Sequence, residues 1–229
     1  MDQKAKFSAL RECELFRSLS DAQIEQLNNL SSLDSFKRGN FLFNIGDNIK
    51  YIYLIQEGSV KVGMNTSNDK VLIKEIIYPG ELLGENIFND TGQRRLFAQT
   101  ISETEAFRIP VSFFKAMLEQ NTSFCEDITK LLITKMSQLE NRMSNFVFKK
   151  AQSRIVDFLR HLAQTKGLKI GLDEILINHG LSHKEIANIT DTSRQTVARV
   201  LGDLKRQNII HFSARKPNKI LIRDMIGLQ

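Results

Sequence analysis

The first half of the chain alternates short apolar segments with turn residues. The strand-sized segments are 41–43, 51–55, 59–62 and 71–77, and Gly, Asn, Asp or Pro residues stand between or after them, at 39–40, 45–47, 57–58, 65–69 and 79–80. Strands punctuated this closely indicate antiparallel β structure that closes into a sandwich or barrel. Ahead of them, residues 20–27 predict a short helix with Ser20 as its N-cap.

After Pro110 the hydrophobic period changes to that of a helix. Between Phe113 and Phe148, apolar residues recur in steps of three and four, close to a heptad seam that begins at Cys125. A helix this long with one apolar stripe needs a partner. It could lie along its own β-domain, through Phe124, Leu131 and Ile133, or pair with a second copy. We expect both contacts, with a parallel or near-parallel homodimer whose interface holds Ile128, Leu132, Met136, Leu139, Met143 and Phe146.

The second half opens with another helical segment, residues 151–164, which Gly167 ends. No linker rich in Pro, Gly or Ser separates it from the long helix. We therefore expect a hinge inside continuous helical sequence, at residues 145–150, where two lysines coincide with the change of period.

The composition is that of an ordinary soluble globular protein of one large domain or two small ones, with 229 residues, 41% of them hydrophobic. Its apolar runs fall far short of the roughly 18 residues that a membrane span needs, and residues 1–16 mix both charge signs without an apolar leader. We therefore expect a cytoplasmic protein without membrane contact. Cys13 and Cys125 are too few for a disulfide framework, a four-cysteine zinc site or an all-cysteine iron–sulfur cluster, and we expect no metal site.

Charge divides the chain into two unlike parts. The 148 residues through Phe148 hold 17 Lys and Arg against 19 Asp and Glu, a net charge of −2, whereas the last 81 hold 15 against 7, a net charge of +8. This asymmetry suggests that the C-terminal part faces a polyanion, although a merely well-solvated basic domain would show the same excess.

Residues 181–201 have the pattern of a helix, a tight turn and a second helix. Ser182 with Glu185, and Thr192 with Gln195, each fit a capping box that marks a helix start. The two helices would pack through Ile186, Ile189, Val197, Val200, Leu201 and Leu204. Downstream, residues 209–212 and 219–222 predict a β-hairpin with a basic tip, so this part of the chain is expected to be a winged helix-turn-helix.

Three polar residues stand at the outward N-terminal end of the second helix, where a recognition helix meets base edges in the major groove. We expect Arg194, Gln195 and Arg199 to read bases, because Arg pairs bidentately with guanine and Gln with adenine. Groups suited to DNA phosphates are Ser182, Lys184, Ser193, Thr196 and Ser213. Helical hairpins with exposed arginines also occur in proteins that never touch DNA, but here turn, caps, core and basic face agree.

The whole chain resembles the Crp/Fnr superfamily of bacterial transcription regulators. The resemblance is carried by residues 52–62, 79–85, the long helix and residues 192–201. It implies an α+β fold with a cyclic-nucleotide-binding-type β jelly roll after an N-terminal helix (1–110), a long dimerisation helix and hinge (111–148) and a winged helix-turn-helix (149–229). It also implies a dimer on a palindromic operator and contact with RNA polymerase. In the family the positions matching Arg194 and Arg199 read guanines, and the position matching Gln195 is often Glu.

The resemblance also places an effector pocket in the β-domain, with Gly84, Glu85, Arg94, Arg95, Leu96, Leu139 and Glu140 as its expected residues. In members that bind cyclic AMP, the position of Glu85 holds the ribose and an Arg-Ser pair holds the phosphate. Here Arg95 is followed by Leu96, which cannot donate a hydrogen bond. By ungapped counting, Leu139 and Glu140 replace the Thr-Ser pair that reads adenine. Both departures disfavour cyclic AMP.

Other sensing chemistries remain open. The four N-terminal cysteines of oxygen-sensing members are absent, and all four histidines lie in the C-terminal half, which disfavours a haem held by imidazole on the β-domain. An unidentified small molecule, a redox event at a lone thiol, or no ligand at all are the alternatives. Cys125 is interpreted as a small core residue and Cys13 as a weak thiolate candidate. Glu85 and Arg95 could equally form a salt bridge across an empty pocket.

These observations lead to one hypothesis for function, a homodimeric, sequence-specific DNA-binding transcription regulator. The alternative is a cyclic-nucleotide-binding interaction module whose basic C-terminal half docks on an acidic protein. No constellation of catalytic residues supports an enzyme.

Overall fold

The computed structural model describes residues 3–65, 71–85, 87, 92–171, 174–212, 219–225 and 227–228. The chain forms two compact units, Met1–Asp69 with Lys74–Gln138, and Lys70–Ile73 with Leu139–Gln229. No helix among the described residues is both long and apolar enough to cross a membrane.

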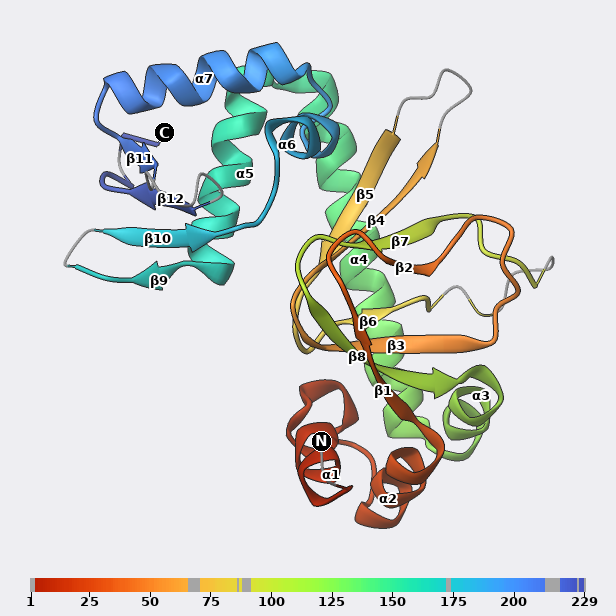
Figure 1. Cartoon of the computed structure of the whole chain (residues 1–229). Coiled ribbons are helices and arrows are strands. Elements are labelled where there is room, and N and C mark those ends of the chain that lie inside the picture. The colour runs from red at the N-terminus through yellow and green to blue at the C-terminus, as the bar shows by residue number, and fades with distance from the viewer. Residues whose placement is uncertain are drawn as a thin grey trace. The chain divides into compact units, whose positions relative to one another are not determined.

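Short helices precede the β structure of the first unit (Figure 1). They are α1 (Gln3–Glu12), a single 3₁₀ turn (Glu14–Phe16) and α2 (Asp21–Leu30). The N-cap of α2 is Ser20, as the sequence predicts, and it forms a complete capping box with Gln23.

Two antiparallel four-stranded sheets make up the β-domain. Their strands are β1 (Ser32–Phe36), β2 (Phe41–Phe43), β3 (Tyr51–Glu57), β4 (Val60–Asn65), β5 (Val71–Ile77), β6 (Leu82–Leu83), β7 (Phe97–Thr100) and β8 (Thr104–Pro110). One sheet has the order β1-β8-β3-β6 and the other β2-β7-β4-β5. The four strands expected from the sequence are confirmed. The sequence pattern did not predict β1, β7 and β8, whose apolar residues alternate with or are flanked by polar ones, or β6, which has only two residues.

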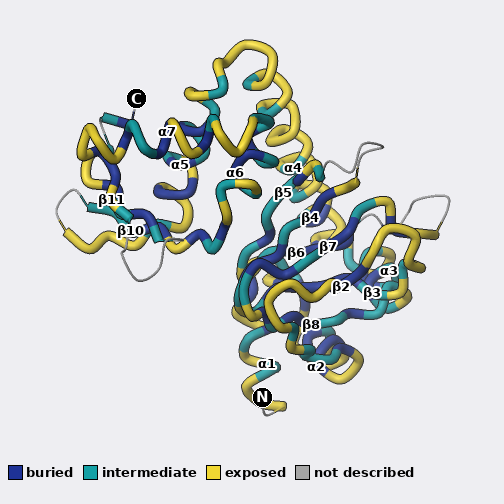
Figure 2. Tube along the Cα trace, turned by 45° about the horizontal axis from the view of Figure 1, so that its top comes forward, coloured by how far each residue is buried: buried dark blue, intermediate teal, exposed yellow. Residues whose placement is uncertain are grey.

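Two apolar clusters hold the β-domain together, and Figure 2 shows buried residues in dark blue along β3, β4 and β7. One lies between the sheets and includes Ile55, Val60, Val62 and Ala98. The other joins the outer face of β3 and β8 to the helices. Phenylalanines fill this second cluster, where the ring of Phe124 lies 6.1 Å from that of Phe16 and 5.4 Å from that of Phe114, centroid to centroid. Such tilted ring pairs add to the stabilisation that comes from burial alone.

The helical segment after Pro110 is two helices, α3 (Val111–Gln120) and α4 (Thr122–Phe148), not the single helix that the sequence predicts. The break falls at Asn121, whose backbone is extended (φ −130°, ψ 101°). The side-chain Oδ1 of Asn121 accepts a hydrogen bond from the Phe124 N–H at 2.9 Å. Asn121 thereby satisfies one of the unpaired N–H groups at the start of α4.

One stripe of α4 faces its own β-domain. Phe124, Ile128 and Leu131 pack against the second cluster, and Lys135 continues the same stripe with its side chain mostly buried. The expected contact with the β-domain is therefore confirmed for Phe124 and Leu131, whereas Ile133 is 54% exposed.

Both thiols differ from their sequence interpretation. Cys125 is exposed on α4 rather than part of a core. Cys13 is buried, and burial raises the pKa of its thiol, so it is not a thiolate candidate.

The second unit contains α5 (Ala151–Lys166), β9 (Leu168–Lys169), β10 (Ile175–Asn178), α6 (His183–Ile189), α7 (Arg194–Arg206), β11 (Ile210–Phe212) and β12 (Lys219–Ile222). Strands β11 and β12 pair antiparallel, as the predicted hairpin requires, in a sheet of order β11-β12-β10-β9. The apolar core between helices and sheet includes Leu159, Ile186, Val200 and Ile220. The basic tip of the hairpin lies outside the described residues.

Helical structure is interrupted inside the interval 145–150 where the sequence predicts a hinge. Helix α4 ends at Phe148 and α5 begins at Ala151. Between them Lys150 has an extended backbone (φ −64°, ψ 152°) and makes no side-chain cap.

Two arginines hold the turn between α6 and α7. The Asp191 carboxylate accepts from Arg142 of α4 at two oxygens, with distances of 3.1 Å to Nε and 2.9 Å to Nη2. Arg154 of α5 donates to the backbone carbonyls of Thr190 (2.9 Å) and Asp191 (2.8 Å). Asp191 has a positive φ of 53°, a conformation that is uncommon for residues other than Gly and that the surrounding contacts must stabilise. The ion pair and carbonyl contacts therefore fix the turn to α4 and α5.

The Arg142–Asp191 pair should contribute measurable stability because it is bidentate and its side chains are only 24% and 21% exposed. We expect a double-mutant cycle with Arg142→Met and Asp191→Asn to give a coupling energy of about 1–2 kcal/mol in urea unfolding. A matched cycle on Lys149 and Asp157, whose side chains are 44% and 28% exposed, should give about 0.5 kcal/mol or less. Equal coupling in the two cycles would show that the Arg142 contact is only a surface ion pair.

A buried histidine makes stability depend on acidity. Burial, with His183 nearby, lowers the pKa of His179 from 6.5 to about 4, and its Nδ1 accepts from the Leu181 N–H at 3.0 Å. The unfolded chain binds the proton more readily than the folded one. The free energy of unfolding is therefore highest above pH 6.5 and falls as the pH is lowered from 6.5 to 4. We expect wild type to lose about 3 kcal/mol more over this interval than His179→Asn, whose side-chain oxygen can still accept from Leu181. Parallel pH profiles of urea unfolding in the two proteins would contradict this.

Candidate functional site

Helix α6 begins at the residue that the sequence predicts. The Ser182 Oγ accepts from the Glu185 N–H at 3.3 Å, and the Glu185 carboxylate accepts from the Ser182 N–H at 2.8 Å. This is the expected capping box, and it fixes the first turn of the helix-turn-helix.

Helix α7 begins one residue later than expected. Its N-cap is Ser193, whose Oγ accepts from the Thr196 N–H at 3.0 Å. The predicted capping box of Thr192 with Gln195 is therefore wrong. Thr192 instead donates its backbone N–H to the Ala187 carbonyl at 2.9 Å, which closes the turn back on α6. Because Gln195 is not used in a cap, its amide is left for other contacts.

The two faces of α7 differ sharply. Val197, Val200, Leu201 and Leu204 are buried in the domain core. The expected base-reading residues, Arg194, Gln195 and Arg199, are all exposed, and among the described residues none of them has a hydrogen-bond or ion-pair partner. Their donors are therefore available, and two guanidinium groups and an amide at the exposed N-terminal end of α7 match the groups that base edges offer in the major groove.

The expected phosphate-contacting residues surround the starts of α6 and α7. Lys184 is exposed, and Ser182 and Ser193 are exposed N-caps. Thr196 is half-buried, with its Oγ1 at 2.9 Å from the Ser193 Oγ. Helix N-termini present backbone N–H groups and a positive dipole end, so both starts are suited to anions. Ser213 lies outside the described residues.

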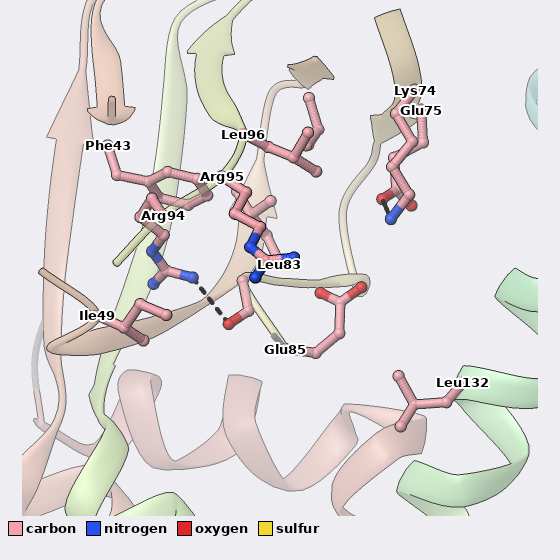
Figure 3. A pocket seen from close by; sticks show the side chains of 12 residues that line it. Phe43, Ile49, Lys74, Glu75, Leu83, Glu85, Arg94, Arg95, Leu96 and Leu132 are labelled. Carbon is pink, nitrogen blue, oxygen red and sulfur yellow. Dashed lines mark hydrogen bonds and ion pairs between the residues drawn. The ribbon is translucent and has the colours of Figure 1, made fainter. Parts of the chain in front are cut away.

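A second candidate site is a pocket of about 450 Å³ in the β-domain (Figure 3). Five of the residues expected there from the resemblance do line it, namely Gly84, Glu85, Arg94, Arg95 and Leu96. Leu139 and Glu140 are not among its lining residues, and α4 contributes Leu132 to the lining.

Arg94 is part of the pocket's frame. Its side chain is buried, and Nη1 donates to the Gly84 carbonyl at 3.0 Å while Nη2 donates to the Tyr51 carbonyl. The guanidinium carbon lies 4.1 Å from the centre of the Phe43 ring. Gly84 has φ +89°, a conformation in which a residue with a side chain is strained, and a Cβ there would lie 2.8 Å from the Arg94 Nη1 and displace the guanidinium. Burial lowers the pKa of Arg94.

The partner of Glu85 is Lys135, a residue that the sequence analysis did not single out. Lys135 Nζ lies 2.8 Å from Glu85 and 3.2 Å from Glu75, and it donates to the Leu82 carbonyl at 3.3 Å. Burial by itself would raise the pKa of Glu85, but the adjacent ammonium outweighs burial and the pKa is lowered.

The sequence allowed a salt bridge between Glu85 and Arg95. In the structure Glu85 pairs instead with Lys135 of α4. The sequence signal that could have found Lys135 is its place four residues after Leu131 and seven after Ile128, on the stripe that faces the β-domain.

Comparisons with known proteins agree with this architecture. Residues 33–121 match the cyclic nucleotide-binding domain family, and residues 153–229 match the Crp-like helix-turn-helix domain family. A CRP-like cAMP-activated global transcriptional regulator of Mycobacterium tuberculosis is 25% identical over 94% of each chain. The anaerobic regulatory protein of Bacillus subtilis is 25% identical over 89% of this chain and 85% of its own.

Solved structures show the same fold. FixK2 of Bradyrhizobium japonicum has a TM-score of 0.76 at 19% identity and covers 86% of this chain and 95% of its own. A Crp/Fnr-family regulator of Thermus thermophilus has a TM-score of 0.67 at 21% identity, over 86% of this chain and 96% of its own.

The sensor-type β-domain, the long helix and the winged helix-turn-helix thus occur together in the order of one family, whose members are transcription regulators and not enzymes. The chain belongs to the Crp/Fnr family of DNA-binding transcription regulators.

Proposed function

We propose that the protein acts in the cytoplasm as a homodimer that recognises a two-fold-symmetric operator through Arg194, Gln195 and Arg199. The observation that carries this proposal is the exposed face of α7, where these three side chains have no partner among the described residues. Arg194 and Arg199 would each pair bidentately with guanine O6 and N7, and Gln195 with adenine N6 and N7. Lys184, Ser182, Ser193, Thr196 and Ser213 would position the motif on phosphates without reading sequence.

The exposed stripe of α4 supports the homodimer. Leu132, Met136, Leu139, Met143 and Phe146 are 44%, 55%, 38%, 70% and 57% exposed, at spacings of three and four residues. A contiguous apolar stripe of this kind is rare on the surface of a monomer, and a second copy of the same helix would cover it. Ile128 is excluded from this interface, because it is buried in the core of its own chain.

The break between α4 and α5 is the element on which regulation would act. Lys149 and Lys150 separate the helix that dimerises from the domain that binds DNA. Small rotations there, which would have to displace the Arg142–Asp191 ion pair, would change whether the two recognition helices match successive major grooves, about 34 Å apart. An effector would shift this equilibrium only by its different affinity for the two states. RNA polymerase is the further partner that such a regulator would contact.

Recognition of bases should depend on the two arginines of α7. We expect selection from a random duplex pool to enrich a two-fold-symmetric site that contains guanines. Replacing Arg194 and Arg199 together by Ala should lower discrimination between that site and random DNA by 10-fold or more, since each bidentate contact contributes about 1–3 kcal/mol.

The matched control is Lys205→Ala with Arg206→Ala, which removes the same charge from the exposed C-terminal end of the same helix. This control should weaken binding to all sequences alike and leave discrimination intact. Unchanged discrimination in the Arg194 and Arg199 variant would contradict base reading, and would favour docking on an acidic protein instead.

Dimerisation should depend on the exposed stripe of α4. We expect Met136→Glu with Met143→Glu to convert a dimer to a monomer in sedimentation equilibrium, because two carboxylates on each helix would lose hydration in the interface. Ile133→Glu, at a 54% exposed position on the same helix but off the stripe, should leave the dimer intact. Equal dissociation of both variants, or of neither, would place the interface elsewhere.

A further inference from the structure

The charges around the β-domain pocket do not balance. Lys74 pairs with Glu75 at 3.0 Å, and Lys135 bridges Glu75 and Glu85. Both carboxylates are therefore engaged by lysines, while two arginines remain. The site carries an excess of positive charge, which favours an anionic ligand.

The two arginines have different roles. Arg94 is buried, and its Nη1 and Nη2 donate to backbone carbonyls, whereas its Nε has no hydrogen-bond partner, so the guanidinium cannot turn to a ligand without breaking both carbonyl contacts. Arg95 is exposed and, in the described part of the chain, has no hydrogen-bond or ion-pair partner. Figure 3 shows the Arg95 guanidinium among the side chains that line the pocket, which also include Glu85. Its planar fork of donors matches a carboxylate.

The rest of the pocket is apolar. Its remaining side chains are Phe43, Ile49, Val62, Leu83, Leu96 and Leu132. A sugar would need hydroxyl partners here, but the two carboxylates that line the pocket, Glu75 and Glu85, are already held by Lys135 at 3.2 Å and 2.8 Å. Burying sugar hydroxyls against this lining without partners would cost free energy. The volume of about 450 Å³ lies in the range of small-molecule sites.

We propose that this pocket binds a small organic carboxylate, with the anionic end on Arg95 and an apolar body between Phe43, Leu96 and Leu132. The ligand leaves the Lys135–Glu85 ion pair in place and touches α4 directly at Leu132. Because α4 also carries the exposed apolar stripe proposed to form the dimer, a ligand that contacts α4 could shift the equilibrium between DNA-binding and non-binding states. This regulatory meaning rests on the proposed function, whereas ligand binding itself does not.

Calorimetric titration of the full-length protein tests the proposal with two probe carboxylates, octanoate and 1-naphthoate. Their neutral counterparts are 1-octanol and 1-naphthalenemethanol. We expect saturable binding of at least one carboxylate and at least 10-fold weaker binding of its alcohol. Arg95→Gln should weaken the carboxylate at least 10-fold. Arg38→Gln, the same charge change at an exposed position of the same unit that does not line the pocket, should leave it unchanged.

Three outcomes would overturn the proposal. They are no saturable binding of either carboxylate, equal binding of acid and alcohol, or binding that Arg95→Gln does not weaken. Micromolar binding of cyclic AMP that competes with the probes would show that the Lys135–Glu85 pair opens for a sugar, and would also overturn it. Operator selection on the same preparation separates the two hypotheses, because intact selection with failed ligand binding refutes only the carboxylate site.

Discussion

The burial of one face of α4 is the constraint on which the rest of the structure depends. Phe124, Ile128 and Leu131 complete an apolar cluster that the β-domain and the short helices cannot close by themselves. The same face then changes character, because Lys135 extends it with an ammonium held by two carboxylates and a backbone carbonyl. A buried charge is tolerated there only because its partners compensate for lost hydration. The long helix is thereby fixed to the wall of the pocket.

A second apolar stripe of α4 runs beside the buried one. It includes Met136, Met143 and Phe146, which are exposed in the single chain. Near its C-terminus the same helix contributes Arg142, whose guanidinium binds both oxygens of Asp191 in the turn of the DNA-binding motif. A single helix therefore takes part in a pocket, an exposed apolar stripe and the turn that orients α7.

The two candidate sites differ in how far their polar side chains are already paired within the protein. On α7 the proposed base-reading side chains Arg194, Gln195 and Arg199 are exposed and have no partners among the described residues, so a ligand would replace only water around them. In the pocket most charged groups are already satisfied by the protein. What distinguishes Arg95 is the absence of such a partner, while its neighbour Arg94 is bound to the backbone. Two adjacent arginines thus differ in burial and in hydrogen-bond partners.

The sequence by itself determined the features that local patterns encode. Turn residues gave four strands of the β-domain, Ser20 and Ser182 marked helix starts, and apolar spacing gave the helix-turn-helix, its hairpin and the break before Ala151. The tertiary structure alone decided what depends on distant partners. Asn121 ends a helix because its side chain caps the next one, Ser193 replaces Thr192 as cap, and Glu85 meets Lys135 across 50 residues. Periodicity reports which face of an element is buried, but only packing decides which side chain lies opposite, and pairing of charges depends on that choice.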